Sequence, residues 1–141
     1  MIRPEELRIR NLFYISVNDG PREVHGVRGS WILYFDGDEI KPREVNQEYC
    51  QPIPITEDWL IKFGFEYFTK PIPADKNPFH FNNEYDFYRY GNIELQSHFV
   101  SYNDKTIALR VNADHVIYHV HTLQNFFYAH GSDLTIKKEQ K

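Results

Sequence analysis

The sequence predicts an α+β fold, in which two helices pack on an antiparallel β-sheet or on a small, partly open barrel. Two observations predict it. Segments 52–66 and 117–137 carry helix signals, and the other runs of β-branched and aromatic residues are separated by short polar turns. With 141 residues, the chain can bury a core without disulfides or metals. We expect a single domain, 1–141, with a β-rich part at 1–50 and a helix, a β-meander and a second helix at 51–141.

The first fifty residues contain two clear strand signals. Residues 12–17 (LFYISV) are rich in β-forming side chains and end at the turn 18–20 (NDG). Residues 31–35 (WILYF) end at the turn 36–38 (DGD). Three prolines between residues 42 and 54 then interrupt regular structure around Cys50. We expect a small, twisted antiparallel sheet before the first helix.

The first helix is predicted from Thr56 to Phe63. The Thr56 side chain can cap it, and the two acidic residues that follow lie where the helix dipole favours negative charge. Ile55 can pack on Leu60 as a hydrophobic staple, and Gly64 supplies the stop. The side chains expected on its buried face are Trp59, Leu60 and Phe63.

The second half predicts strands followed by a helix. A short strand is expected at 65–68, a loop at 70–78, and then three strands at 85–90, 93–102 and 106–111 that form a β-meander. Helical spacing returns with Val120, Leu123 and Phe127, and Gly131 is a natural C-cap. The charged end, 137–141, is expected to fray.

The composition narrows the class of protein. The net charge of −4 argues against a dedicated nucleic-acid binder, which needs an excess of Lys and Arg. No apolar run approaches the roughly 18 residues of a membrane helix, and the first residues carry no secretory signal. The single cysteine excludes an internal disulfide. We therefore expect a cytoplasmic protein that does not contact a membrane.

Four histidines near the C-terminus are the candidates for metal chemistry: His115, His119, His121 and His130. A helix would place His115 and His119 on one face, whereas a strand would align His119 with His121. Either pair could bind zinc, but a catalytic site needs a third ligand, and the sequence contains no HExxH motif. We expect ordinary structural histidines and no cofactor; a small metal-dependent hydrolase is one alternative.

Two segments could bind a ligand or a partner. On a helix, His121, Asn125 and Tyr128 share a polar face with Gln124 beside them, although both amides can instead hydrogen-bond to neighbouring backbone. The aromatic segment 79–90 could stack on unpaired RNA bases or contact a protein if exposed, and it is a core face if buried. The candidate binding residues are Tyr85, Tyr88, Arg89, Tyr90, His119, His121, Asn125 and Tyr128.

Two sequence blocks carry a resemblance to a family. The blocks are PIPITEDWLIKFGFE (52–66) and IYHVHTLQNFFYAHGSDLTIK (117–137). They resemble the PIPLTEEWLLKLGFE-like and YVHQLQNLYFALTGEELT-like blocks of short uncharacterised proteins from phages and prophages of Bacteroidota. Residues 6–12 are similar to the EELRIGNLV-like opening of that family. The structural signature of the two blocks in this chain is Ile55, Thr56, Trp59, Leu60, Phe63, Gly64, Leu123, Phe127 and Gly131.

The resemblance implies a phage accessory role. Small phage proteins often bind and disable a host component, so we expect a non-enzymatic protein that binds and inhibits a host defence component in the bacterial cytoplasm. An RNA-guided (CRISPR) nuclease or its guide RNA is the expected target. The alternative is a nucleic-acid-binding or regulatory module of phage replication, in which RNA or DNA is the partner.

Overall fold

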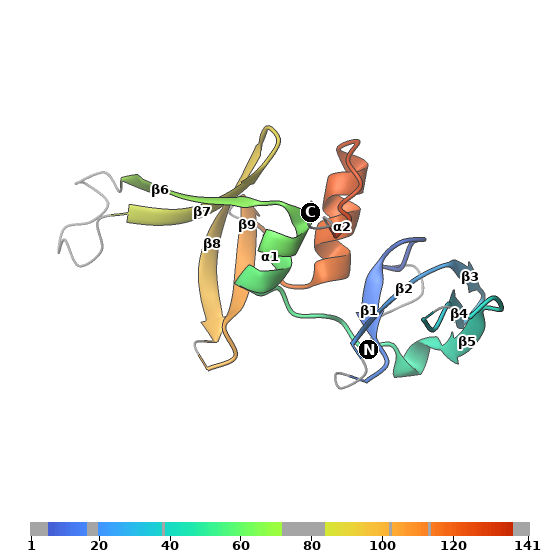
Figure 1. The fold of residues 1–141 in the computed structure, drawn as a ribbon. Helices are drawn as coiled ribbons and strands as arrows, with labels where there is room; N and C mark the ends of the chain where they lie inside the picture. The colour runs from blue at the N-terminus through green and yellow to red at the C-terminus, as the bar shows by residue number, and fades with distance from the viewer. Residues whose placement is uncertain are drawn as a thin grey trace, which may run out of the picture. The chain divides into compact units, whose positions relative to one another are not determined.

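The computed structural model of the chain describes residues 6–16, 20–37, 39–71, 84–101, 103–112 and 114–136. The described residues form an α+β fold with two α-helices and ten strands in three antiparallel sheets (Figure 1). The predicted fold class is confirmed in its sheet form, because none of these three sheets closes into a barrel within the described ranges. Parts of the sequence predictions lie outside the described residues, at 17–19, 38, 72–83, 102 and 137–141.

The chain forms two compact units. Unit 1 contains the described residues of Met1–Pro54 and His119–Leu134, and unit 2 contains those of Ile55–Tyr118 and Thr135–Lys141. Unit 1 thus joins the β-rich N-terminal part with the C-terminal helix, whereas unit 2 holds the first helix and the meander. That the whole chain acts as a single domain stays a prediction.

Unit 1 contains two small sheets. β1 (Leu12–Tyr14) pairs with β2 (Pro21–Glu23), and β4 (Trp31–Tyr34) lies between β3 (Gly26–Arg28) and β5 (Arg43–Asn46). A short 3₁₀ helix follows at Gln47–Tyr49. The strands predicted at 12–17 and 31–35 are present but shorter than expected. The buried cluster of this unit is Leu7, Phe13, Val24, Ile32, Tyr34 and Cys50.

The second helix of the chain, α2 (Val120–Ala129), belongs to unit 1. Leu123 and Phe127 on its apolar face are fully buried, as the helical spacing predicts. Gly131 has a φ of 86°, and the Ser132 N–H donates to the Phe127 carbonyl at 2.9 Å. This glycine-centred ending satisfies carbonyls of the last turn, so the predicted stop at Gly131 is confirmed.

Unit 2 is built on a five-stranded antiparallel sheet in the order β10-β9-β8-β7-β6 (Figure 1). Its strands are β6 (Glu66–Pro71), β7 (Glu84–Tyr90), β8 (Ile93–Ser101), β9 (Thr106–Asn112) and β10 (His115–Ile117). The predicted meander is confirmed as β7 to β9. The loop predicted from residue 70 is wrong at its start, because Lys70 and Pro71 pair with Tyr85 and Glu84 and so extend β6.

The first helix of the chain, α1 (Glu57–Phe63), matches its predicted signals. The Thr56 hydroxyl accepts a hydrogen bond from the Trp59 N–H at 3.4 Å, which confirms the cap. Gly64 has a φ of 94°, and the Phe65 N–H donates to the Leu60 carbonyl at 2.9 Å. The expected face of Trp59, Leu60 and Phe63 is buried, as is Ile55. The contact between Ile55 and Leu60 stays a prediction.

The left-handed backbone at Gly64 leads to a test of α1. Replacing Gly64 by alanine should lower the free energy of unfolding by about 1 kcal/mol, because a Cβ disfavours positive φ. Asparagine tolerates this conformation better than alanine, so Gly64→Asn should lose less. Urea unfolding of the three proteins measures the difference, and an alanine variant as stable as the native chain would contradict this account of the helix ending.

Candidate functional site

The register of the unit 2 sheet brings polar and aromatic side chains to one face. Cross-strand partners share a face of a sheet, and Tyr67 pairs with Tyr88 while Phe99 pairs with Ile107. Alternation along β7 and β8 then places Asp86 on the same face as Tyr88, and Ser97 on the same face as Phe99. Backbone pairing at the start of β9 brings α1 to this part of the sheet, since the Ile107 N–H donates to the Ile55 carbonyl at 2.8 Å.

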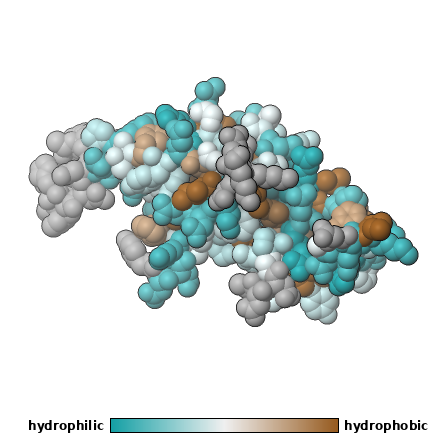
Figure 2. All heavy atoms as spheres, viewed as in Figure 1, coloured by the Kyte–Doolittle hydropathy of each residue, from teal (hydrophilic) through white to brown (hydrophobic). Residues whose placement is uncertain are grey.

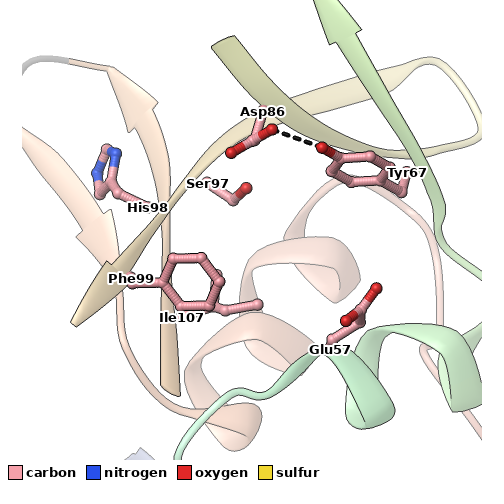
Figure 3. Close-up of a pocket in the computed structure, with 7 residues that line it drawn as sticks. All are labelled: Glu57, Tyr67, Asp86, Ser97, His98, Phe99 and Ile107. Carbon is pink, nitrogen blue, oxygen red and sulfur yellow. Dashed lines mark hydrogen bonds between the residues drawn. The ribbon is translucent and has the colours of Figure 1, made fainter. Parts of the chain in front are cut away.

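These residues line a pocket of about 170 Å³, called the Asp86 pocket below. It is lined by Glu57, Tyr67, Asp86, Ser97, His98, Phe99 and Ile107 (Figure 3). A wider hollow of about 490 Å³ shares three of these residues and is lined by Thr56, Glu57, Asp58, Phe99, Asp104, Lys105 and Ile107. The start of α1 therefore forms a wall common to both spaces.

Tyr67 and Asp86 form the polar wall of the Asp86 pocket. The Tyr67 hydroxyl donates to the Asp86 carboxylate at 2.5 Å (Figure 3). This hydrogen bond raises the pKa of Tyr67 to about 12, with burial and the nearby charges of Asp86, Glu84 and Glu57 adding to it. Tyr67 therefore keeps its proton throughout the physiological range.

Two other polar groups of the Asp86 pocket, Ser97 and Glu57, make no side-chain hydrogen bond or ion pair within the described part of the chain. Ser97 is 9% exposed, and its hydroxyl points into the pocket toward Asp86 and Tyr67 without a hydrogen bond to any described residue (Figure 3). Neither Glu57 nor Asp86 makes an ion pair within the described residues. At the edge, burial and the charge of Arg110 lower the pKa of His98, so His98 adds little positive charge near pH 7.

The opposite face of the same sheet carries an aromatic pair. The rings of Phe68 and Phe87 stack at 5.4 Å, and both side chains are half-buried. Lys70 Nζ lies 4.8 Å from the Phe87 ring centre, and Arg89 lies over Phe68 at 5.2 Å. Both cations are neutralised by ion pairs, Lys70 with Glu94 at 2.6 Å and Arg89 with Glu66 at 2.7 Å.

The candidate residues of the aromatic segment divide between these faces. Tyr88 is 4% exposed, and burial raises its pKa to about 12, so it takes the core alternative and offers no ring for base stacking. Tyr85 and Tyr90 are half-buried, and Arg89 is exposed on the opposite face from Tyr88. The part of the segment from 79 to 83 lies outside the described residues.

The polar face of α2 binds the N-terminal segment of unit 1. The Leu12 N–H donates to Gln124 Oε1 at 2.8 Å, and Gln124 Nε2 donates to the carbonyls of Arg10 and Leu134 at 3.1 and 3.2 Å. Asn125 accepts from Arg8 Nε at 2.7 Å. The predicted alternative, that the two amides hydrogen-bond to neighbouring backbone, is therefore observed for Gln124 and also for Asn125, through the Glu6 carbonyl.

Arg8 also covers the aromatic member of this face. Its guanidinium carbon lies 3.8 Å from the ring centre of Tyr128, a cation–π contact. Asn125 Nδ2 donates to the Glu6 carbonyl at 2.7 Å, so both ends of this amide are used inside unit 1. Asn125 and one face of Tyr128 thus stabilise the unit itself, while Tyr128 keeps more than half of its surface exposed.

The histidines separate into different environments. His115 lies in β10 and His119 is the N-cap residue of α2, so the helical alternative, with both on one face of a helix, is not the one observed. His119 and His121 stack at 5.9 Å, but His121 lies in α2 and not in a strand. Burial lowers the pKa of His121 to about 4, with a smaller effect of His119, and burial also lowers the pKa of His119.

Among the described residues, the histidine pair is not part of a larger group of metal-binding side chains. Across the described ranges, no group of three or more His, Cys, Asp or Glu side chains is placed to bind a metal ion. His121 Nδ1 is buried and has no hydrogen-bond partner in this part of the molecule. His130 lies at the end of α2, with Nδ1 at 2.8 Å from the Phe126 carbonyl.

The sequence did not indicate the Asp86 pocket. Glu57 was predicted only as a helix-start charge, while Tyr67, Ser97 and Phe99 belong to strand predictions that did not specify the strand pairing. The available signal was the alternation of polar and aromatic residues along 84–90 and 93–101. The register decides which alternating set shares a pocket, and register is a property of paired strands.

Comparison with known proteins leaves the site to be interpreted on its own geometry. No family model, no curated protein and no solved structure matches the chain. In the described part, helices long and apolar enough to cross a membrane are absent. On the face shown in Figure 2, the coloured hydrophobic residues lie in several small groups between hydrophilic ones.

Proposed function

We propose that this chain is a non-enzymatic phage or prophage accessory protein that binds and inhibits a bacterial defence component in the cytoplasm. The target is an RNA-guided nuclease, contacted as a protein or through its guide RNA. The proposal joins the resemblance of residues 52–66 and 117–137 to phage proteins with one structural observation. That observation is the open, acidic and aromatic surface formed by the Asp86 pocket and its neighbouring hollow.

The chemistry of this surface suits a protein partner. Tyr67 and Phe99 are each about half exposed, at 54% and 51%, and large aromatic side chains of this kind commonly anchor interfaces. Glu57 and Asp86 add negative charge beside them. A nuclease has basic grooves that bind phosphate, so an acidic surface with aromatic anchors is complementary to such a groove.

A defence assay tests the proposal. Expressed in a bacterium that restricts phage through an RNA-guided nuclease, the chain should restore plaque formation toward the level of a nuclease-free strain. The purified chain should co-elute with the nuclease, or with its guide RNA complex, in size-exclusion chromatography. Absence of protection against every defence system tested, together with absence of any complex, would reject the proposal.

A matched pair of variants connects inhibition to the surface. Tyr67→Ala combined with Phe99→Ala removes both exposed aromatic side chains, and we expect it to abolish protection. Trp31→Ala removes an exposed aromatic residue of unit 1, which does not line this surface, and should retain protection. Equal activity of the two variants would exclude the Asp86 pocket as the contact.

The second candidate function is single-stranded nucleic-acid binding. The specific observation in its favour is the Phe68–Phe87 pair with Lys70 and Arg89 beside it, since aromatic rings and cations on a sheet face can stack bases. Against it, both cations are already paired with glutamates and the net charge is −4. A salt-sensitive gel shift with RNA that is lost on Phe87→Ala would favour this candidate.

A further inference from the structure

Uncompensated negative charge is the first unusual feature of the Asp86 pocket. Glu57 and Asp86 both line it, and neither carboxylate makes an ion pair with a described residue. The adjoining hollow is lined by one cation, Lys105, and by two further carboxylates, Asp58 and Asp104. The pocket therefore carries negative charge without a built-in positive partner among the described residues.

Ser97 supplies a second and independent feature. It is 9% exposed, so it is more than nine-tenths buried, yet its hydroxyl makes no hydrogen bond in the described part of the chain. Figure 3 shows the hydroxyl directed into the space between Asp86 and Tyr67. The hydroxyl lines the pocket and has no partner among the described residues, so it marks a position where a ligand donor could be accepted.

The apolar walls limit the kind of cation that fits. The aromatic side chains of Tyr67 and Phe99 line the pocket, and Ile107 lies beside Phe99 (Figure 3). Rings of this kind attract organic cations through their faces, and the alkyl part of a lysine or arginine side chain can pack along the apolar surface beside them. A divalent metal would instead need several converging oxygen or nitrogen ligands, and no group of three such residues exists among the described residues.

We propose that the Asp86 pocket binds a guanidinium or alkylammonium group, the end of an arginine or lysine side chain presented by the partner protein. The cation lies against Tyr67 and Phe99 and donates hydrogen bonds to Asp86 and to the Ser97 hydroxyl. The volume of the Asp86 pocket, about 170 Å³, accommodates one such group, and the adjoining hollow receives the partner residues on either side of it. The identity of the source, a partner protein, rests on the proposed function.

The Tyr67–Asp86 hydrogen bond prepares this site. The Tyr67 hydroxyl donates to one oxygen of the Asp86 carboxylate, and the remaining lone pairs of this carboxylate can accept hydrogen bonds from a ligand. The acidic field also opposes ionisation of Tyr67 and Tyr88, whose pKa values are both raised to about 12 with Glu57 among the causes. A field that disfavours phenolate favours a bound cation.

Titration of the purified full chain with short peptides tests the inference. The ligands are matched peptides that carry arginine, lysine or citrulline, which is a neutral analogue of arginine. Binding of each peptide is measured from the backbone NMR shifts of the protein. We expect saturable shifts at Ser97 and Phe99 with arginine and lysine, weakened by added salt, and no saturation with citrulline. Butylammonium is the probe for a small free cation. If the pocket binds a side chain presented by a protein, the lysine peptide should bind more tightly than butylammonium.

Three variants of the pocket and one control variant complete the test. Asp86→Asn should weaken arginine-peptide binding at least about fivefold, and Glu57→Gln should weaken it in the same direction. Ser97→Ala removes the hydroxyl acceptor and should also weaken arginine-peptide binding. Glu48→Gln removes one negative charge at an exposed position of unit 1 and should leave the binding unchanged. Native-like NMR spectra establish that each variant is folded. Equal binding of citrulline, or unchanged binding in the Asp86 and Glu57 variants, would overturn the inference.

The result separates this inference from the proposed function. Cation binding by a chain that protects against no defence system would reject the inhibitor proposal and keep the pocket as a site for small organic cations. Protection by a chain whose pocket binds none of the cationic probes would keep the inhibitor proposal and reject the pocket. The peptide titration does not require the partner, so the two outcomes are independent.

Discussion

Replacing Gln124 by methionine should lower the free energy of unfolding by about 3 kcal/mol, because it removes the amide partner of three backbone groups, two of them buried and one partly buried. Gln124 is 5% exposed and connects α2 to the backbone of Leu12, Arg10 and Leu134. Methionine keeps the length of the side chain but supplies neither donor nor acceptor. Urea unfolding of the two proteins at pH 7 measures the loss.

The control for this prediction is the same substitution at an exposed position of unit 1. Gln51 is exposed, and Gln51→Met should change the free energy of unfolding by less than about 0.5 kcal/mol. Comparable losses at the two positions would show that methionine is costly for a general reason. A native-like stability of Gln124→Met would contradict the role of this amide in joining α2 to the N-terminal segment.

Acid should destabilise the protein through His121. Burial lowers the pKa of His121 to about 4, and His119 lowers it further while Glu6 opposes the shift. In the unfolded chain this side chain titrates near 6.5. Between about pH 6.5 and 4 the unfolded state therefore binds a proton at His121 that the folded state does not bind. The contribution is present above pH 6.5 and decreases by about 3 kcal/mol as the pH falls to 4.

The test compares the pH dependence of stability in two proteins. His121→Leu removes the titrating group but keeps an apolar side chain, so its free energy of unfolding should fall less steeply between pH 6.5 and 4 than that of the native chain. His130→Gln, at an exposed position, should retain the native slope. Parallel slopes for native protein and His121→Leu would contradict a depressed pKa at His121, which NMR titration of its ring can report directly.

The helices show how far local sequence reaches. Thr56 and Gly64 begin and end α1 because a hydroxyl acceptor and a left-handed glycine act over only a few residues. The same reasoning holds for Gly131 after α2. Such signals are complete within one turn of the chain, so sequence alone can predict them.

The strands are harder because pairing supplies much of their stability. The strong β-forming runs at 85–90, 93–102 and 106–111 were predicted and are observed as β7, β8 and β9. β2, β3, β5 and β10 have only three or four residues each and carry no clear alternation, and the sequence did not predict them. These short segments are strands because a neighbour pairs with them.

Binding candidates required the three-dimensional arrangement. Tyr88 and Arg89 are adjacent in sequence, yet one is in the core and the other is exposed, because a strand alternates its faces. Asn125 was a candidate contact and is instead bonded to Arg8 and Glu6. Neither outcome can be read from residue type, since tyrosine and asparagine occur in both settings.

Local sequence alone decides the class of the fold, the ends of its two helices and its main meander, because these depend on propensities and caps that act within a few residues. Tertiary structure decides which faces are buried and which residues meet. Tyr67, Asp86 and Ser97 come from three strands, and only the register of β6, β7 and β8 brings them around one pocket. A shift of one residue in that pairing would turn every one of these side chains to the other face.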